Sequence, residues 1–219
     1  MIDHIRKLIY LVVLIGYSSA FSGSYEDFFI AIKQDDSRTV ESLLKRGFDP
    51  NARDPKGFHG LFLAVKEPSP KVATVLVAWP KTEVETRTAD DESPVMIASL
   101  NGDLELVRQM VRRGAHVNKP GWTALHYAAT NGHLPVMKFL LDESAYIDAE
   151  APSGATPLMM AAHYATPQAV KLLLDEGADP LLKDRRGLSA IDFANRANRG
   201  ESAELIAAHV RNRQPKGKW

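Results

Sequence analysis

The sequence predicts an all-α solenoid of about six helix–turn–helix repeats, and three observations lead to this prediction. A short motif recurs along the chain at intervals close to 33 residues. Each copy precedes a second stretch whose apolar residues recur at helical spacing. A turn that usually contains glycine closes most of the copies. Self-similarity at a fixed period of roughly 20–50 residues is the signature of a repeat array.

The opening motif is clearest in the middle of the chain. Residues 121–129 read Gly-Trp-Thr-Ala-Leu-His-Tyr-Ala-Ala, and residues 154–162 read Gly-Ala-Thr-Pro-Leu-Met-Met-Ala-Ala. Weaker copies cover residues 57–64, 93–98 and 187–194. The leucine-type position of the motif falls at 61, 95, 125, 158 and 191, in steps of 34, 30, 33 and 33 residues.

Residues at the start of the motif are suited to begin a helix. Thr156 and Ser93 can each cap the first helix of their repeat by accepting a backbone N–H bond. Pro157 and Pro94 then fall at the first helical position, where a missing N–H costs nothing. We therefore expect helices to start directly after Thr156 and Ser93.

The closing motif predicts where each second helix ends. Gly47, Gly114 and Gly177 each follow an apolar helical stretch. Glycine adopts the left-handed conformation that terminates many helices at little cost. Ser144 occupies the same position in another copy.

Together, these motifs resemble the ankyrin repeat, over about residues 25–210. The resemblance implies paired antiparallel helices, with β-hairpin fingers projecting between repeats. The predicted organisation is a signal peptide at 1–20, an N-terminal capping repeat at 21–51, a degenerate repeat two at 52–85, repeat three at 86–118, repeat four at 119–148, repeat five at 149–180, a C-terminal capping repeat at 181–210 and a basic disordered tail at 211–219.

Repeat two departs from the pattern. His59-Gly60 replaces the usual Thr-Pro, so we expect its first helix to lack a cap, a loss worth ~0.5–2 kcal/mol. Trp79-Pro80 ends its second helix without glycine. Sequence drift and a partner-specific surface both explain these departures.

One finger is predicted to be short. Six positions separate Asn51 from Gly57, but only three separate Asn118 from Gly121. The finger between repeats three and four therefore lacks three residues. We expect a notch in the row of fingers where Trp122 emerges.

The first twenty residues have the order of a secretory signal. Arg6 and Lys7 precede an apolar run at 8–15, and small residues follow. Cleavage is predicted after Ala20, with Ser22 as the alternative. An uncleaved anchor is a further alternative, although the run is shorter than the ~20 residues of a membrane span.

Composition argues against several function classes. The 27 basic and 27 acidic residues give no basic excess, so no nucleic-acid partner is expected. The absence of cysteine excludes disulfides and thiolate chemistry. No phosphate-binding loop or nucleophile elbow is present. We therefore expect neither catalytic residues nor a cofactor.

Candidate metal ligands have plainer interpretations. His126 and His133 occupy motif positions that ankyrin repeats use structurally, and they are too far apart for a compact zinc pair. His163 is more open to question. The acidic run at 90–92 does not follow the spacing of a calcium loop, so a solvated finger is favoured. No metal site is predicted.

The resemblance also implies where a partner docks, because ankyrin proteins usually bind partners on the finger tips and the adjoining concave helical face. Trp122, Tyr127, Met160 and Tyr164 should lie near one another there, either as a binding hot spot or as ordinary packing between repeats. The partner-binding prediction comprises Phe58, Glu92, Asn101, Trp122, Tyr127, Asn131, Met160, His163, Tyr164, Arg185 and Arg186. The wider exposed set adds Lys66, Glu67, Asp90, Leu100, Thr130, Ser153, Leu188 and Arg196.

The sequence thus predicts a non-enzymatic protein-interaction module, exported to the periplasm of a Gram-negative bacterium or secreted, and monomeric. The alternative is an inhibitor or immunity-type protein that covers the active site of one enzyme. An enzyme with an unrecognised site is a third hypothesis. Fold alone does not decide between them.

Overall fold

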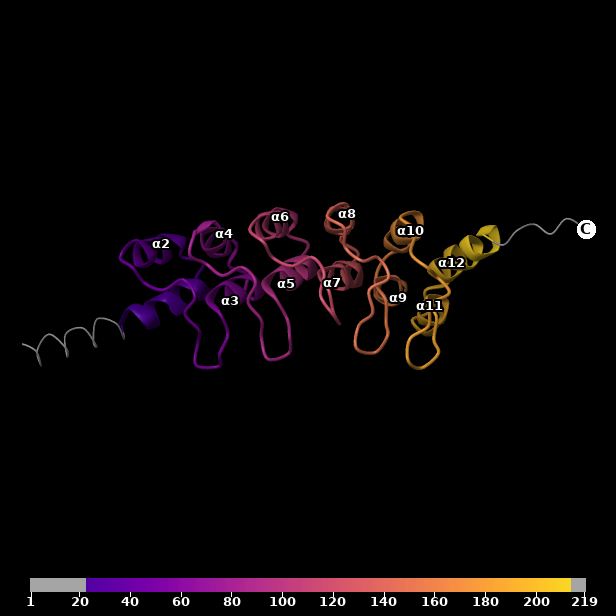
Figure 1. Cartoon of the computed structure of the whole chain (residues 1–219), viewed down its shortest axis with the longest axis horizontal. Helices are drawn as coiled ribbons and strands as arrows, with labels where there is room; N and C mark the ends of the chain where they lie inside the picture. The colour runs from indigo at the N-terminus through magenta and orange to yellow at the C-terminus, as the bar shows by residue number, and fades with distance from the viewer. Residues whose placement is uncertain (1–22, 214–219) are drawn as a thin grey trace, which may run out of the picture. The chain divides into compact units, whose positions relative to one another are not determined.

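The computed structural model describes residues 23–213, and its regular elements are helices (Figure 1). The predicted signal peptide lies outside the described residues. In the part described, no helix is long and apolar enough to cross a membrane. The helices are residues 23–33, α2 (Ser37–Lys45), α3 (Gly60–Lys66), α4 (Pro70–Ala78), α5 (Pro94–Asn101), α6 (Leu104–Arg112), α7 (Ala124–Asn131), α8 (Leu134–Asp142), α9 (Pro157–Tyr164), α10 (Pro167–Asp175), α11 (Ala190–Arg196) and α12 (Gly200–Arg213).

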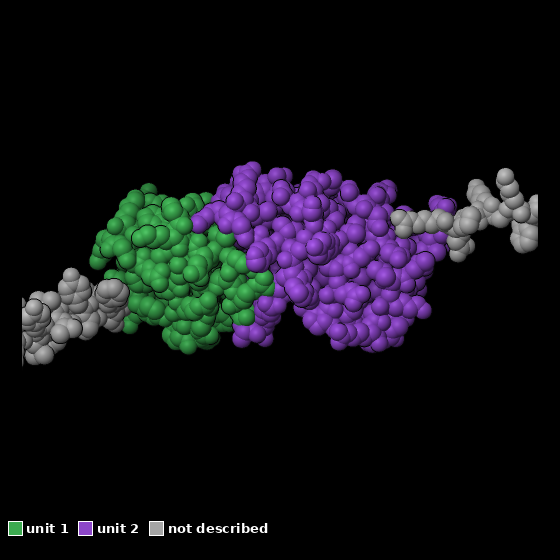
Figure 2. All heavy atoms as spheres, viewed as in Figure 1, with its two compact units in different colours: residues 1–88 green, residues 89–219 purple. Residues whose placement is uncertain are grey.

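The chain divides between Thr88 and Ala89 into two compact units, which Figure 2 shows in different colours. Unit 1 holds the first four described helices, through α4. Unit 2 holds α5 to α12. The regular repeat period did not predict this division.

The helices of unit 2 lie in two rows (Figure 1). The first helices of the pairs, α5, α7, α9 and α11, contact one another in sequence, and α6, α8, α10 and α12 do the same. Alanines make close contact possible in the first row: Ala128 and Ala129 of α7 and Ala161 and Ala162 of α9 are each 0% exposed. The arrangement is that of a helical repeat solenoid.

Helix starts follow the sequence only in part. Pro94 and Pro157 stand at the start of α5 and α9, as expected. The Thr156 hydroxyl accepts the Met159 N–H at 3.4 Å. The prediction for Ser93 was wrong, because its side chain makes no capping bond. Ser93 is buried, and α5 instead starts with Pro94 at its first position, where the backbone angle of proline already suits a helix.

The prediction that repeat two lacks a cap was also wrong. His59 takes the place of threonine: its Nδ1 accepts the Leu61 N–H at 3.1 Å. The opposite ring nitrogen, Nε2, lies 3.1 Å from Asn51 Oδ1. The imidazole is long enough to cap α3 and reach the preceding loop at once, so the helix keeps a capping bond.

Helix ends agree with the glycine pattern. Gly47, Gly114 and Gly177 have φ angles of 92°, 93° and 102°, in the left-handed region. Ser144 adopts the same conformation, with φ 64°. At the C-terminus α12 continues to Arg213, so residues 211–213 are helical rather than part of a disordered tail. The rest of the predicted tail lies outside the described residues.

The loops between repeats contain no β-strand in residues 23–213. Single antiparallel bridges join Arg53 to His59 and Lys183 to Ser189. In the loop before α9, the Ala151 N–H donates to the Ala155 carbonyl at 2.9 Å. Hairpin-like loops are therefore present, while the expected β-hairpins and the number of repeats remain predictions.

Candidate functional site

The loop between α6 and α7 is the short finger of the sequence, and Lys119 organises it. The Lys119 ammonium lies 2.5 Å from the Asp91 carboxylate and donates to the Trp122 carbonyl at 3.0 Å. Its side chain is only 8% exposed. A largely buried cation therefore fixes the backbone of Trp122. Figure 1 shows that the loop between α6 and α7 is shorter than the loops on either side of it.

Trp122 is half-buried against the start of α7. Its ring meets the His126 ring edge-on at a centroid distance of 5.2 Å and the Tyr127 ring edge-on at 6.4 Å. Edge-to-face geometry is the favoured arrangement of such rings. These contacts pack the indole against the first turn of α7.

A hollow of about 250 Å³ opens beside Trp122 within unit 2. The loop before α7, the loop before α9, and helices α9 and α11 all contribute to its wall. Five residues of the partner-binding prediction line it, together with Ser153 of the wider exposed set. The full lining is Trp122, Ser153, Ala155, Met160, His163, Tyr164, Arg186 and Phe193.

Aromatic rings dominate the α9 side of the hollow. His163 meets Tyr164 edge-on at 4.3 Å and Phe193 edge-on at 6.0 Å. Its Nδ1 lies 3.2 Å from the Phe193 carbonyl oxygen, to which it donates when protonated at that nitrogen. Tyr164 is 53% exposed, a large fraction for an apolar ring. The wall thus combines fixed rings with one tyrosine that is available to solvent.

Arg186 supplies the charge of the hollow. Its Nε and an Nη nitrogen both lie 2.8 Å from Asp184 Oδ2, and its guanidinium stands 5.5 Å from the centre of the Phe193 ring. Burial tends to raise the pKa of Asp184, but hydrogen bonds from the Leu188 and Arg186 amides and the guanidinium outweigh it and lower that pKa. Arg186 is therefore held in place while 63% of its side chain stays exposed.

Tyr127 and Glu92 lie beside Trp122 rather than in the hollow. The Tyr127 hydroxyl donates to the Glu92 carboxylate at 3.0 Å. Burial, followed by this hydrogen bond, raises the pKa of Tyr127 well above 10. The pair is therefore a contact between repeats. This agrees with the interpretation of Tyr127 as ordinary packing between repeats rather than as part of a binding hot spot.

The remaining predicted residues of unit 2 lie outside the hollow. Asn131 donates its amide to the Leu100 carbonyl at 2.8 Å. Asn101 and Arg185 are exposed. The Arg185 backbone N–H donates to the Ser153 carbonyl at 2.9 Å, which places it next to one residue of the lining.

His126 has the structural role that the motif predicts. It is 0% exposed. Its Nδ1 accepts the Thr123 N–H at 3.2 Å, and its Nε2 donates to the Ala155 carbonyl at 3.0 Å. Burial lowers its pKa to about 4. The neutral ring thus joins α7 to the loop before α9.

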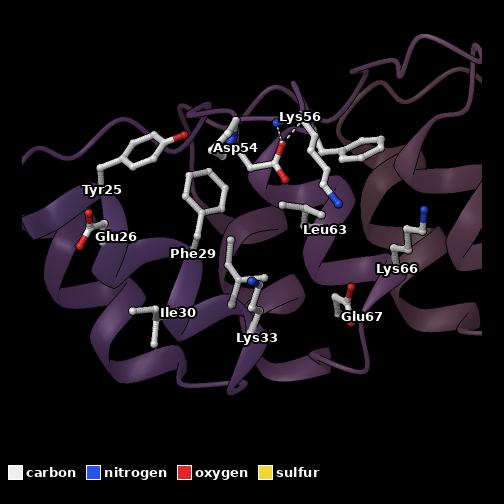
Figure 3. Close-up of a pocket in the computed structure, with 13 residues that line it drawn as sticks. Tyr25, Glu26, Phe29, Ile30, Lys33, Asp54, Lys56, Leu63, Lys66 and Glu67 are labelled. Atoms are coloured by element: carbon white, nitrogen blue, oxygen red, sulfur yellow. Dashed lines mark hydrogen bonds between the residues drawn. The ribbon is translucent and has the colours of Figure 1, made fainter. Parts of the chain in front are cut away.

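Unit 1 carries a larger groove, of about 610 Å³. Of the partner-binding prediction only Phe58 belongs to it, together with Lys66 and Glu67 of the wider exposed set. Phe58 stacks on Phe62 at 5.5 Å, with the Lys66 ammonium 5.3 Å from its ring centre. In Figure 3, Tyr25 and Phe29 of the first helix lie on one side and Lys66 of α3 on the other. The lining is Tyr25, Glu26, Phe29, Ile30, Ile32, Lys33, Asp54, Pro55, Lys56, Phe58, Leu63, Lys66 and Glu67.

The groove of unit 1 and two wall residues of the hollow were missed in the sequence. Phe28, Phe29 and Ile30 are consecutive, and one helix face cannot bury all three; Phe28 is buried, whereas Ile30 is 50% exposed. That run was a signal from which an exposed apolar surface in unit 1 could have been predicted. Ala155 and Phe193 gave none, because both occupy ordinary motif positions.

Neither surface shows a metal centre. In the described residues no group of three or more His, Cys, Asp or Glu side chains could hold a metal ion. In the acidic run, Asp91 pairs with Lys119 and Glu92 accepts from Tyr127. Two of its three carboxylates therefore have partners within the protein.

Two family models match the chain. One, described as ankyrin repeats in three copies, matches residues 28–119 and again 61–151. The chain belongs to the ankyrin-repeat family. A second model, described as ankyrin repeats in many copies, matches residues 145–194. Ankyrin-repeat proteins are generally non-enzymatic modules for protein interaction.

Curated ankyrin-repeat relatives share part of this chain. Ankyrin repeat and SAM domain-containing protein 6 of Mus musculus is 35% identical over 119 residues, 52% of this chain and 13% of that protein. A putative ankyrin repeat-containing protein of Treponema pallidum (strain Nichols) is 28% identical over 179 residues, 80% of this chain and 49% of that protein. The chain thus spans less than half the length of either relative.

A solved structure extends the similarity to the fold. It is one chain of the complex described as Bd0816 predatory endopeptidase from Bdellovibrio bacteriovorus in complex with immunity protein Bd3460. The TM-score is 0.71 at 25% identity, covering 83% of this chain and 97% of that chain.

Proposed function

We propose that this chain is an exported, non-enzymatic interaction module that binds one protein partner through the hollow of unit 2. One observation carries the proposal: Trp122 from the loop before α7, Met160 and Tyr164 from α9, and Arg186 from the loop before α11 line one hollow together. Tryptophan, tyrosine and arginine are the residues that most often dominate binding energy at interfaces. The hollow offers all three types.

The size of the hollow fits a protein partner. At about 250 Å³ it is smaller than the 300–1,000 Å³ of most small-molecule sites. It can accept one side chain from a partner whose wider surface rests on the neighbouring loops. Family membership supports the same use, because ankyrin repeats commonly serve as protein-interaction modules.

Affinity capture tests this proposal. Tagged wild-type protein and the W122A/Y164A double variant are exposed to an envelope extract, and captured proteins are identified by mass spectrometry. Tyr146→Ala is the matched control, because Tyr146 is 68% exposed and lies outside the lining of the hollow. We expect wild type and the control to retain a partner that the double variant loses. Equal capture by all three proteins would contradict the use of this surface.

Export is the second part of the proposal, and the leader motivates it. Arg6 and Lys7 before an apolar run, followed by small residues, have the order of a secretory signal. Fusing the leader to an alkaline phosphatase that lacks its own signal should give periplasmic activity. A fusion that stays inactive would remove this part and leave the binding proposal standing.

An inhibitor or immunity-type role is the alternative. The solved complex in which one chain shares this fold pairs an endopeptidase with an immunity protein. If this alternative holds, the captured partner is an enzyme, and its activity falls when an equimolar amount of the wild-type protein is added. A captured enzyme that stays fully active would exclude it.

A further inference from the structure

We infer that the partner enters the hollow of unit 2 with an acidic segment that carries one bulky apolar side chain. The inference rests on the proposed function, because it names the chemistry that fits the same surface. Three features support it: the local charge, the placement of the arginines, and the apolar wall.

The last two loops and α11 have a positive charge that the whole chain lacks. The chain has 27 basic and 27 acidic residues. Residues 181–200 contain five basic residues, Lys183, Arg185, Arg186, Arg196 and Arg199, against two acidic ones, Asp184 and Asp192, a difference of +3. Of these five residues, Arg186 lines the hollow, and the Arg185 backbone bonds to the lining residue Ser153.

The two local carboxylates already have partners. Asp184 has a fully buried side chain and accepts the Leu188 N–H at 3.0 Å as well as the Arg186 guanidinium. Asp192 accepts both the N–H and the hydroxyl of Ser189, at 2.8 and 2.7 Å. Neither carboxylate forms an ion pair with the other arginines in the described structure.

One arginine lines the hollow, and a second is bound to the end of α9. Arg186 lines the hollow and stands over Phe193, fixed by its bond to Asp184. An Nη nitrogen of Arg199 donates to the Tyr164 carbonyl at 3.0 Å, so this second guanidinium lies at the C-terminal end of α9. Each guanidinium makes a hydrogen bond within the protein, while its side chain remains exposed to solvent. An exposed guanidinium of this kind can bind a carboxylate.

Arg185 provides a third cation close to the opening. Its backbone N–H bonds the carbonyl of Ser153, a lining residue, and its side chain is exposed. Because the backbone makes this bond, replacing the side chain leaves the loop contact intact. Arg185 is therefore the position where charge can be removed with the least change to the fold.

Apolar and aromatic side chains form part of the wall of the hollow. Trp122, Met160, Tyr164 and Phe193 are four of its eight lining residues, and no carboxylate is among the eight. An acidic segment alone would leave this surface unfilled. A bulky apolar side chain flanked by carboxylates fills the centre and pairs with the arginines at the rim.

A single-stranded nucleic acid also combines negative charge with apolar bases, but the surface suits it less. Nucleic-acid binding without sequence preference needs a positive groove that follows the backbone over several nucleotides. Here residues 181–200 carry a difference of only +3, and the chain as a whole is neutral. An acidic protein segment requires only this one cluster.

Fluorescence anisotropy with labelled peptides tests the inference on the full chain. The probe is Glu-Glu-Phe-Glu-Glu with blocked ends. Three matched peptides replace all Glu with Gln, all Glu with Lys, or Phe with Ala, and an oligothymidine is the nucleic-acid probe. We expect the acidic Phe peptide to bind most tightly, with an affinity that falls as salt rises. Tighter binding of the neutral peptide, the basic peptide or the oligothymidine would overturn the inference.

Protein variants connect the binding to this site. R185Q should weaken the acidic Phe peptide by up to about fivefold, the scale of one exposed ion pair, and leave the Gln peptide unchanged. R185Q/R199Q should weaken it further, and thermal melting reports whether that variant remains folded. The control is R38Q/R112Q, on α2 and α6, which changes the net charge by the same amount as R185Q/R199Q does. Equal weakening by the control, or no effect of R185Q, would contradict the site.

The two proposals fail in different ways. If partner capture depends on Trp122 and Tyr164 while the peptides show no preference for acid, the docking surface stands and the inferred chemistry falls. If capture does not depend on these residues, the docking surface falls whatever the peptides show.

Discussion

At the scale of single residues, His59 shows how an unusual side chain restores a function of the motif. It is 2% exposed, caps α3 through Nδ1 and contacts Asn51 through Nε2. His59→Ala removes both bonds, so we expect a loss of about 2 kcal/mol, the upper end for a cap. Urea unfolding measures it. His59→Asn keeps a capping side chain and should cost less; equal loss in both variants would contradict the capping role.

The two buried histidines also make stability depend on pH. Burial lowers the pKa of His59 and of His126 from 6.5 to about 4. The unfolded chain therefore binds protons more readily, so their contribution is complete above pH 6.5 and is lost as the pH falls toward 4. At pH 5 we expect each to reduce stability by roughly 2 kcal/mol.

Urea unfolding at pH 7 and pH 5 checks this dependence. The double variant H59N/H126N removes both titrating rings. It should be less stable than wild type at pH 7 but lose less stability on acidification. An identical loss in wild type and variant would show that other groups control the acid response.

At the scale of elements, the end of α5 requires glycine more strongly than other helix ends do. Gly102 has φ 77°, and a Cβ there would lie 2.5 Å from the His133 ring. Gly114 has φ 93° with open space around it. Left-handed backbone alone costs about 1–2 kcal/mol, so G114A should lose that amount and G102A clearly more. Similar melting temperatures for the two variants would contradict the clash with His133.

The shortened loop before α7 depends on Lys119 in the same way. Lys119→Met keeps the aliphatic stem but removes the bonds to Asp91 and to the Trp122 carbonyl. We expect a loss of about 1 kcal/mol for the hydrogen bond, together with weaker partner binding because Trp122 is less firmly placed. Thermal melting and affinity measure the two effects. Unchanged affinity would show that Lys119 does not position Trp122.

At the scale of the whole molecule, the sequence predicted most of the fold because its signals are local. Proline at 94 and 157 and glycine at 47, 114 and 177 act through their own backbone angles. Helical periodicity then indicates which faces pack. These signals repeat with a fixed period, so several weak copies reinforce one prediction.

The features that could not be predicted depend on distant contacts. The capping bond of His59 requires the position of its ring relative to the Leu61 amide, which no repeat pattern specifies. The division at Thr88 follows from packing density along the chain. Phe193 joins the hollow only because α11 packs beside α9. Motif positions placed Trp122, Met160 and Tyr164 near one another, but they did not indicate that Ala155 and Phe193 line the same hollow.

The central claim is that the hollow of unit 2 binds the partner, and the affinity of Trp122→Ala for the captured partner tests it most directly. Isothermal titration calorimetry compares wild type, W122A and the control Y146A, each checked by thermal melting. The account predicts that W122A loses about 2 kcal/mol of binding free energy or more, while Y146A binds as wild type does. Unchanged affinity of a folded W122A variant would contradict it.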